Sequence, residues 1–228
     1  ITLVASGIEM LQDAGVESPA RLLTPLVQAS LDNALRMGYH ALRRGARDDA
    51  YSLGWGAPLA STVGFVDAMR IGSDVAPYWL PRDPEPGTEY QAPSVRNAYI
   101  NTVSRTWQHR RLWQNDPDCL MLRHSETDLT DVEIATWSAA VAVSGGLALV
   151  SDDLALLGER ERALLDRVIE VGRAADAASL GPDEPRCDDL MRPGGPTSIS
   201  GGGASMTADP ERPVPSFGGT ASGFGTDS

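Results

Sequence analysis

The 228-residue sequence has few of the residues that build disulfide frameworks or metal sites. Cys119 and Cys187 are its two cysteines, so neither a disulfide framework nor a four-thiolate metal site can be assembled, and a reducing compartment, the cytoplasm, fits best. His40, His109 and His124 share no i, i+4 spacing and no carboxylate pattern of a zinc hydrolase. We therefore predict no metal and no cofactor.

Long apolar runs and a surplus of basic residues are also missing. No run approaches the roughly eighteen apolar residues that a membrane span requires. Thirty-one acidic against 19 basic residues give a formal net charge of -12, a field that repels nucleic acid and anionic membrane surfaces. We expect a soluble protein with neither as a partner. Because the chain starts at Ile1 without a signal-peptide pattern, we also expect a fragment of a longer protein.

Short apolar segments alternate with amphipathic ones along residues 1–192. The apolar segments predict strands at residues 1–5, 50–53, 66–71, 118–122 and 147–151. Capping signals and apolar stripes predict helices from Thr24-Pro25 to Gly45, from Ser94 to about residue 112, from the capping box at 130–133 to about residue 143, and over 159–176. Strands followed by helices predict an α/β fold with a parallel sheet and crossover helices.

An arginine and a carboxylate follow the strand predicted at residues 66–71. Gly72 lets the backbone turn sharply, so Asp74 projects from the strand end with Arg70 close by in sequence. In barrels of alternating strands and helices, catalytic residues gather at that rim. The pair is therefore a candidate site, and an ordinary ion pair of Arg70 with Asp67 or Asp74 is the alternative.

Two further groups of polar residues are candidates, one at the start of the strand predicted at residues 118–122 and one just after the strand predicted at residues 147–151. Asn115, Asp116 and Asp118 could form a catalytic cluster, but short polar side chains also satisfy the backbone of tight turns, and we favour the turn. Asp152 and Asp153 could reach a pocket rim or cap the final helix, and we favour capping.

Four stretches resemble the signature motifs of one enzyme family in the family's order. Residues 54–59, 70–79, 113–120 and 151–154 are similar to those of the melibiase-type α-galactosidases, which are retaining glycoside hydrolases built on a (β/α)₈ barrel. A complete barrel has eight strands and typically about 250 residues. The resemblance therefore implies that residues 1–192 are the carboxyl-terminal half of a TIM-barrel catalytic domain, about strands four to eight.

The resemblance also assigns roles to carboxylates. A retaining glycosidase uses one carboxylate as nucleophile and another as acid/base, about 5–5.5 Å apart. Asp74 matches the family's acid/base. The family's nucleophile is an aspartate at the end of the fourth strand, and matching the pattern puts that position immediately before Ile1. The chain alone is therefore expected to be inactive.

Three residues match or neighbour substrate-binding positions of the family. Arg70 matches an arginine on the substrate side of the site, where its fork of donors could hold sugar hydroxyls or the nucleophile's carboxylate. Trp55 occupies a loop position that lines the galactose pocket in relatives, although the family varies there, and core packing is the alternative. Trp79 lies in the same loop as Asp74 and could serve as a sugar platform or pack in the core.

The resemblance implies a fragment of a cytoplasmic α-galactosidase that hydrolyses terminal α-linked galactose from oligosaccharides such as melibiose or raffinose, with retention of configuration. The oligosaccharide is then the expected partner, and an oligomer of the full-length parent stays open. The alternatives are a galactosyl transferase relative, which uses the same carboxylates with a sugar as acceptor, and a non-catalytic carbohydrate-binding fragment.

Residues 193–228 differ in composition from the rest of the chain. They are rich in Gly, Ser, Thr and Pro and have few large apolar residues, so we favour a low-complexity, disordered tail. Because the family carries a small antiparallel β-domain after the barrel, the alternative is that residues 196–214 form its first strands.

Overall fold

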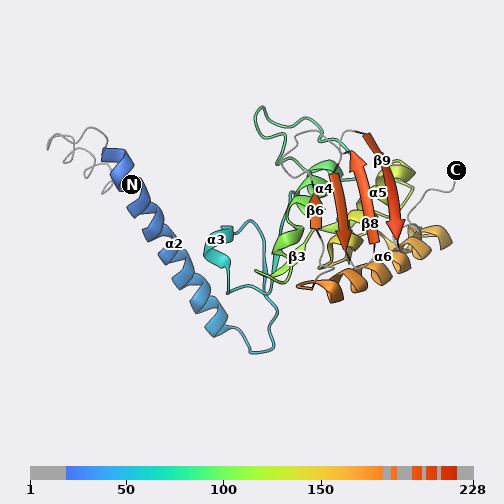
Figure 1. Cartoon of the computed structure of the whole chain (residues 1–228). Coiled ribbons are helices and arrows are strands. Elements are labelled where there is room, and N and C mark those ends of the chain that lie inside the picture. The colour runs from blue at the N-terminus through green and yellow to red at the C-terminus, as the bar shows by residue number, and fades with distance from the viewer. Residues whose placement is uncertain (1–18, 182–185, 189–196, 202–203, 210–211, 220–228) are drawn as a thin grey trace. The chain divides into compact units, whose positions relative to one another are not determined.

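The computed structural model describes residues 19–181, 186–188, 197–201, 204–209 and 212–219 (Figure 1). The strand predicted at residues 1–5 lies outside these ranges. The chain divides into two compact units, residues 1–67 and residues 68–228, and each is described by itself.

The first unit is built around one long helix, α2 (Pro19–Gly45). The helix ends at Gly45 as predicted, but it begins at Pro19, so the predicted start at Thr24-Pro25 is wrong. Proline is favoured in the first turn of a helix, and Pro19 occupies that place instead of Pro25. The short elements β1 (Leu53–Gly54) and α3 (Leu59–Thr62) follow.

Asp67 closes the first unit through a forked ion pair. Its two carboxylate oxygens accept from Arg43 at 2.8 and 3.1 Å, and one of them also accepts from the backbone N–H of Ser52 at 2.8 Å. The Ser52 hydrogen bond and then Arg43 lower the pKa of Asp67, outweighing the effect of its burial. The alternative that Arg70 forms an ion pair with Asp67 is therefore wrong, because Asp67 pairs with Arg43.

The second unit contains two parallel strand pairs. β2 (Ala68–Arg70) pairs with β3 (Gln114–Asp116), and β4 (Cys119–Leu120) pairs with β5 (Leu149–Val150). A helix lies between the two strands of each pair, so the predicted α/β fold with parallel strands and crossover helices is confirmed. β3 was not predicted, because its sequence Gln-Asn-Asp has no apolar alternation.

The crossover helices are α4 and α5, and a further helix, α6, follows β5. α4 (Val95–Ser104) begins as predicted, with the Ser94 hydroxyl accepting from the N–H of Asn97, but it ends well before residue 112. Arg105 leaves the helical conformation, and its carbonyl accepts from the side chain of Asn115, so the chain continues as the 3₁₀ turn η1 (Thr106–Gln108).

The two later helices match their predictions closely. α5 (Asp131–Ser144) opens with the predicted capping box, in which the Thr130 hydroxyl accepts from the N–H of Glu133 and the Glu133 carboxylate accepts from the N–H of Thr130. α6 covers Glu159–Ala178, and a 3₁₀ turn, η2 (Leu154–Leu156), precedes it.

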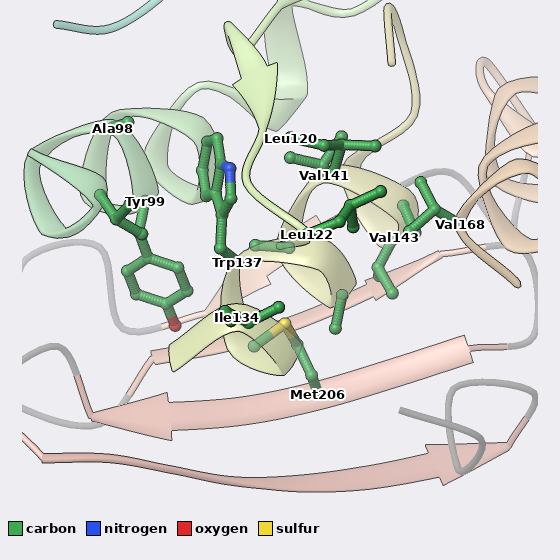
Figure 2. Packing of buried hydrophobic residues seen from close by; sticks show 14 of the residues in the cluster. Ala98, Tyr99, Leu120, Leu122, Ile134, Trp137, Val141, Val143, Val168 and Met206 are labelled. Atoms are coloured by element: carbon green, nitrogen blue, oxygen red, sulfur yellow. The ribbon is translucent and has the colours of Figure 1, made fainter. Parts of the chain in front are cut away.

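The hydrophobic core surrounds α5, whose residues from Ile134 to Ser144 are all buried. Trp137 is fully buried at its centre, and its indole N–H donates to the carbonyl of Cys119 at 3.0 Å. Tyr99 of α4 and Val168 of α6 belong to the same cluster. Figure 2 shows Met206 reaching from the C-terminal sheet toward Ile134 of α5. Leu120 of β4 belongs to the same cluster, so this core packs against that parallel strand.

An antiparallel sheet forms where a disordered tail was expected. β6 (Arg186–Asp188), β7 (Thr197–Gly201), β8 (Ala204–Asp209) and β9 (Arg212–Gly219) pair in that order (Figure 1, orange to red). Of residues 193–228, the structure describes 197–201, 204–209 and 212–219, which form antiparallel strands as in the alternative rather than the favoured tail; the other residues of this stretch lie outside the described ranges. Ile199 and Met206 supply the buried apolar side chains that the composition seemed to lack.

Candidate active site

Arg70 is the centre of a cluster of carboxylates at the carboxyl ends of β2 and β3. It is paired in register with Asp116, the last residue of β3. Its Nε donates to Asp116 Oδ2 at 2.9 Å, one terminal nitrogen donates to Asp74 Oδ1 at 3.1 Å, and the other lies 3.1 Å from Asp118 Oδ1. One guanidinium thus holds three carboxylates, two of which the sequence analysis had treated as turn residues.

The cluster has a buried side and a solvent side. The side chain of Asp116 is 0% exposed and those of Asp118 and Arg70 are 9% and 13% exposed, whereas that of Asp74 is 53% exposed. Burial by itself lowers the pKa of Arg70, but the carboxylates of Asp116, Asp118 and Asp74 outweigh it, so the pKa is raised from its ordinary value. The buried carboxylates thus keep the arginine charged, and Asp74 is the acid that an external molecule can reach.

The backbone around Asp74 is fixed by contacts from both neighbouring segments. The Val75 N–H donates to Asp118 Oδ2 at 2.9 Å, and the Asp74 carbonyl accepts from the N–H of Ser94 at 3.0 Å. Gly72 lies against α4, where an added Cβ would approach the Cβ of Asn101 to 3.1 Å. The loop after β2 therefore packs closely against α4 at Gly72, and backbone hydrogen bonds on both sides of Asp74 hold it in place.

The predicted turn between β3 and β4 is present. Asp116 Oδ1 accepts from the N–H of Asp118 at 2.9 Å, and Asp118 has a φ of +83°, a left-handed conformation that aspartate tolerates better than most residues. The turn interpretation was incomplete, since the same carboxylates bind Arg70. The carboxyl ends of neighbouring parallel strands meet at one edge, but Asp116 lies before the strand predicted at residues 118–122, so no signal in the sequence pointed to its contact with Arg70.

The two predicted tryptophans have different surroundings. Trp55, in the first unit, is 67% exposed, so the core-packing alternative does not apply to it. Trp79 is 7% exposed and belongs to the core, where its ring lies 6.1 Å from that of Tyr99. This burial favours the packing alternative for Trp79, and its contact with substrate stays a prediction.

Asp152 and Asp153, which follow β5, have different roles. Asp152 is fully buried and accepts from the N–H groups of Leu122 and Arg123 at 2.7 and 3.3 Å, so the prediction that it caps the final helix is wrong. Asp153 is a cap, but of η2 rather than of α6, since its carboxylate accepts from the N–H of Ala155.

Among the described residues, no group of three or more His, Cys, Asp or Glu side chains is placed to hold a metal ion. Within the same ranges, no helix is long and apolar enough to cross a membrane. A cavity of about 540 Å³ lies beside α4, lined by residues that include Ser73, Arg96 and Arg105. Asp74 is not among its lining residues.

The parallel strands and crossover helices define an α/β protein. Its second unit, with carboxylates at the strand ends, is consistent with part of a TIM barrel. No family model matches the sequence. The solved structures that the chain resembles are α-galactosidases, which confirms the resemblance carried by the motifs.

Three of these structures show how far the similarity extends. The α-galactosidase of Thermus thermophilus in complex with p-nitrophenyl α-D-galactopyranoside is 24% identical, with a TM-score of 0.51 over 81% of this chain and 32% of its own. The same enzyme in complex with stachyose is 30% identical, with a TM-score of 0.52 over 59% and 29%. α-Galactosidase I of Mortierella vinacea is 17% identical, with a TM-score of 0.51 over 78% and 47%. The chain thus spans between about a third and a half of their lengths.

Proposed function

We propose that this chain carries the general acid/base and part of the substrate site of a retaining α-galactosidase. The observation that supports this most is Asp74, a half-exposed carboxylate at the carboxyl end of a parallel strand, held by Arg70 within a cluster that is otherwise buried. Glycosidic bond cleavage needs such a group, because the leaving oxygen must be protonated as the bond breaks.

By the same proposal, the second carboxylate of the reaction belongs to a longer polypeptide that contains this chain. In a retaining enzyme it attacks the anomeric carbon from the opposite side, about 5–5.5 Å from the acid/base. Asp74 donates its proton in the first step and takes one from water in the second. By this proposal the 228-residue chain alone hydrolyses no aryl α-galactoside above background, and clear turnover by the purified chain would contradict it.

The proposed substrate is an oligosaccharide with terminal α-linked galactose, of the melibiose or raffinose type. The ligands of the Thermus enzyme, a nitrophenyl α-galactoside and stachyose, support this class. Trp55 is proposed to offer its exposed indole to the apolar face of the galactose ring. The low cysteine content supports the cytoplasm as the place of action.

Asp74→Ala in the longer protein tests the role of Asp74. Removal of a general acid slows bond cleavage by a factor on the order of 10²–10⁴ when the leaving group needs a proton, as in raffinose. Hydrolysis of a nitrophenyl galactoside falls much less in its first step, because the phenolate leaves unaided. Asp166→Ala, an exposed position on α6, is the matched control and should leave both rates unchanged. If Asp74→Ala leaves raffinose hydrolysis within a few-fold of wild type, Asp74 is only a loop carboxylate.

A further inference from the structure

Asp118 contacts both the side chain that orients Asp74 and the backbone that carries it. Its Oδ1 lies 3.1 Å from a terminal nitrogen of Arg70 and accepts from the N–H of Cys119 at 2.8 Å. Its Oδ2 accepts from the N–H of Val75 at 2.9 Å. The turn interpretation explains the bond to Cys119, but it does not explain contacts with residues more than 40 positions away.

The bond to Val75 fixes the peptide group that follows Asp74. The carbonyl of this peptide belongs to Asp74 and accepts from the Ser94 N–H, while its N–H belongs to Val75 and donates to Asp118. Both ends of one planar unit are therefore held by different segments, which restricts the ψ angle of Asp74. Arg70 holds the carboxylate itself, and Asp116 and Asp118 hold Arg70 in turn.

The surroundings make these bonds strong. The Asp118 side chain is 9% exposed, and a charged acceptor shielded from water binds N–H donors more strongly than an exposed one. Asp118 has a φ of +83°, a conformation that is unfavourable for most residues with a side chain, and in this conformation its carboxylate reaches Arg70 and the Val75 N–H. An asparagine would tolerate the same backbone but could not accept on both sides of its side chain.

We infer that Asp118 is a positioning residue for proton transfer by Asp74: it clamps the peptide after Asp74 and, through Arg70, the direction of the Asp74 carboxylate. This inference rests on the proposed function. A displacement of about 1 Å at a catalytic group can reduce a rate on the order of 10²-fold, so loss of the clamp should slow the step that needs the proton.

The first test uses Asp118→Asn and Asp118→Glu in the longer protein, assayed on raffinose and on a nitrophenyl galactoside. Both variants should lose raffinose turnover, on the order of 10²-fold for asparagine, while the nitrophenyl substrate stays within a few-fold. Asp118→Glu keeps the charge that Arg70 needs, so it should fold even if Asp118→Asn does not. Equal losses on both substrates, or unchanged raffinose turnover, would overturn the inference.

Asp152→Asn is the matched control. Asp152 is equally buried and also accepts from two backbone N–H groups at a strand end, but it contacts neither Arg70 nor the loop of Asp74. Its substitution should lower stability and reduce both activities by the same factor. A selective loss on raffinose in this control would show that any buried carboxylate produces the effect.

The second test needs no activity and separates this inference from the proposed function. Amide hydrogen exchange in the 228-residue chain should show a protected Val75 N–H, and Asp118→Asn should remove that protection while the α5 amides stay protected. Retained protection of Val75 in Asp118→Asn would overturn the clamp. If the longer protein has no galactosidase activity but Val75 loses protection, the clamp stands and the proposed function fails.

Discussion

Substitution of Arg70 by methionine should destabilise the second unit far more than loss of an ordinary ion pair. Methionine keeps much of the side-chain volume but leaves Asp116, which is fully buried, and Asp118 without their countercharge. Breaking a buried ion pair in this way costs about 3–5 kcal/mol. The lost contact with Asp74 adds little, because an exposed pair contributes at most about 1 kcal/mol.

The assay is urea unfolding of the 228-residue chain, followed by tryptophan fluorescence, with Arg43→Met as the control. Arg43 pairs with both oxygens of Asp67, but these side chains are 40% and 30% exposed, so the control should lose only about 0–1 kcal/mol. Adding Asp116→Asn to Arg70→Met removes the uncompensated charge and should restore part of the stability. If Arg70→Met costs no more than Arg43→Met, the buried cluster described here is wrong.

Three further predictions concern stability. Burial lowers the pKa of His109 below its ordinary 6.5, outweighing the Asp176 carboxylate 2.7 Å away, so the folded state binds fewer protons than the unfolded one. The melting temperature should therefore fall as pH drops below about 6.5, and His109→Gln should weaken this dependence, as measured by thermal unfolding at several pH values. Gly146 has a φ of +96° and an added Cβ would overlap the Asn115 carbonyl, so Gly146→Ala should cost at least about 1–3 kcal/mol in urea unfolding; an unchanged midpoint would contradict this contact. Trp137→Ala should cost about 3–5 kcal/mol in calorimetry, and a loss under about 1 kcal/mol would mean that α5 is not the centre of the core.

Features set by residues close in sequence could be predicted. The Ser94 cap, the capping box of Thr130 and Glu133, and the end of α2 at Gly45 each depend on chemistry within a single turn of helix. The motif that placed Asp74 at a strand end is equally local. The position of Asp74 at the exposed side of the cluster agrees with the role proposed for it.

Features set by distant residues could not be predicted in the same way. The buried carboxylate of Asp116 in β3 has its charged partner, Arg70, in another strand 46 positions away. The C-terminal strands were only the less favoured alternative, because they are stabilised by pairing with one another and by buried side chains such as Ile199 and Met206 rather than by local composition. Trp79 shows the same limit, since its sequence position allowed both packing and sugar binding, and only its burial in the fold favours packing.

The central claim is that Asp74 is the acid/base of a retaining enzyme. The most direct measurement is azide rescue of Asp74→Ala in the longer protein, with an activated aryl α-galactoside as substrate and NMR to assign the anomer of the product. In an acid/base variant, azide attacks the galactosyl-enzyme without a general base, because it has no proton to lose, and an α-galactosyl azide with faster turnover is expected. A β-galactosyl azide would make Asp74 the nucleophile, and either that product or the absence of any azide adduct would contradict the account.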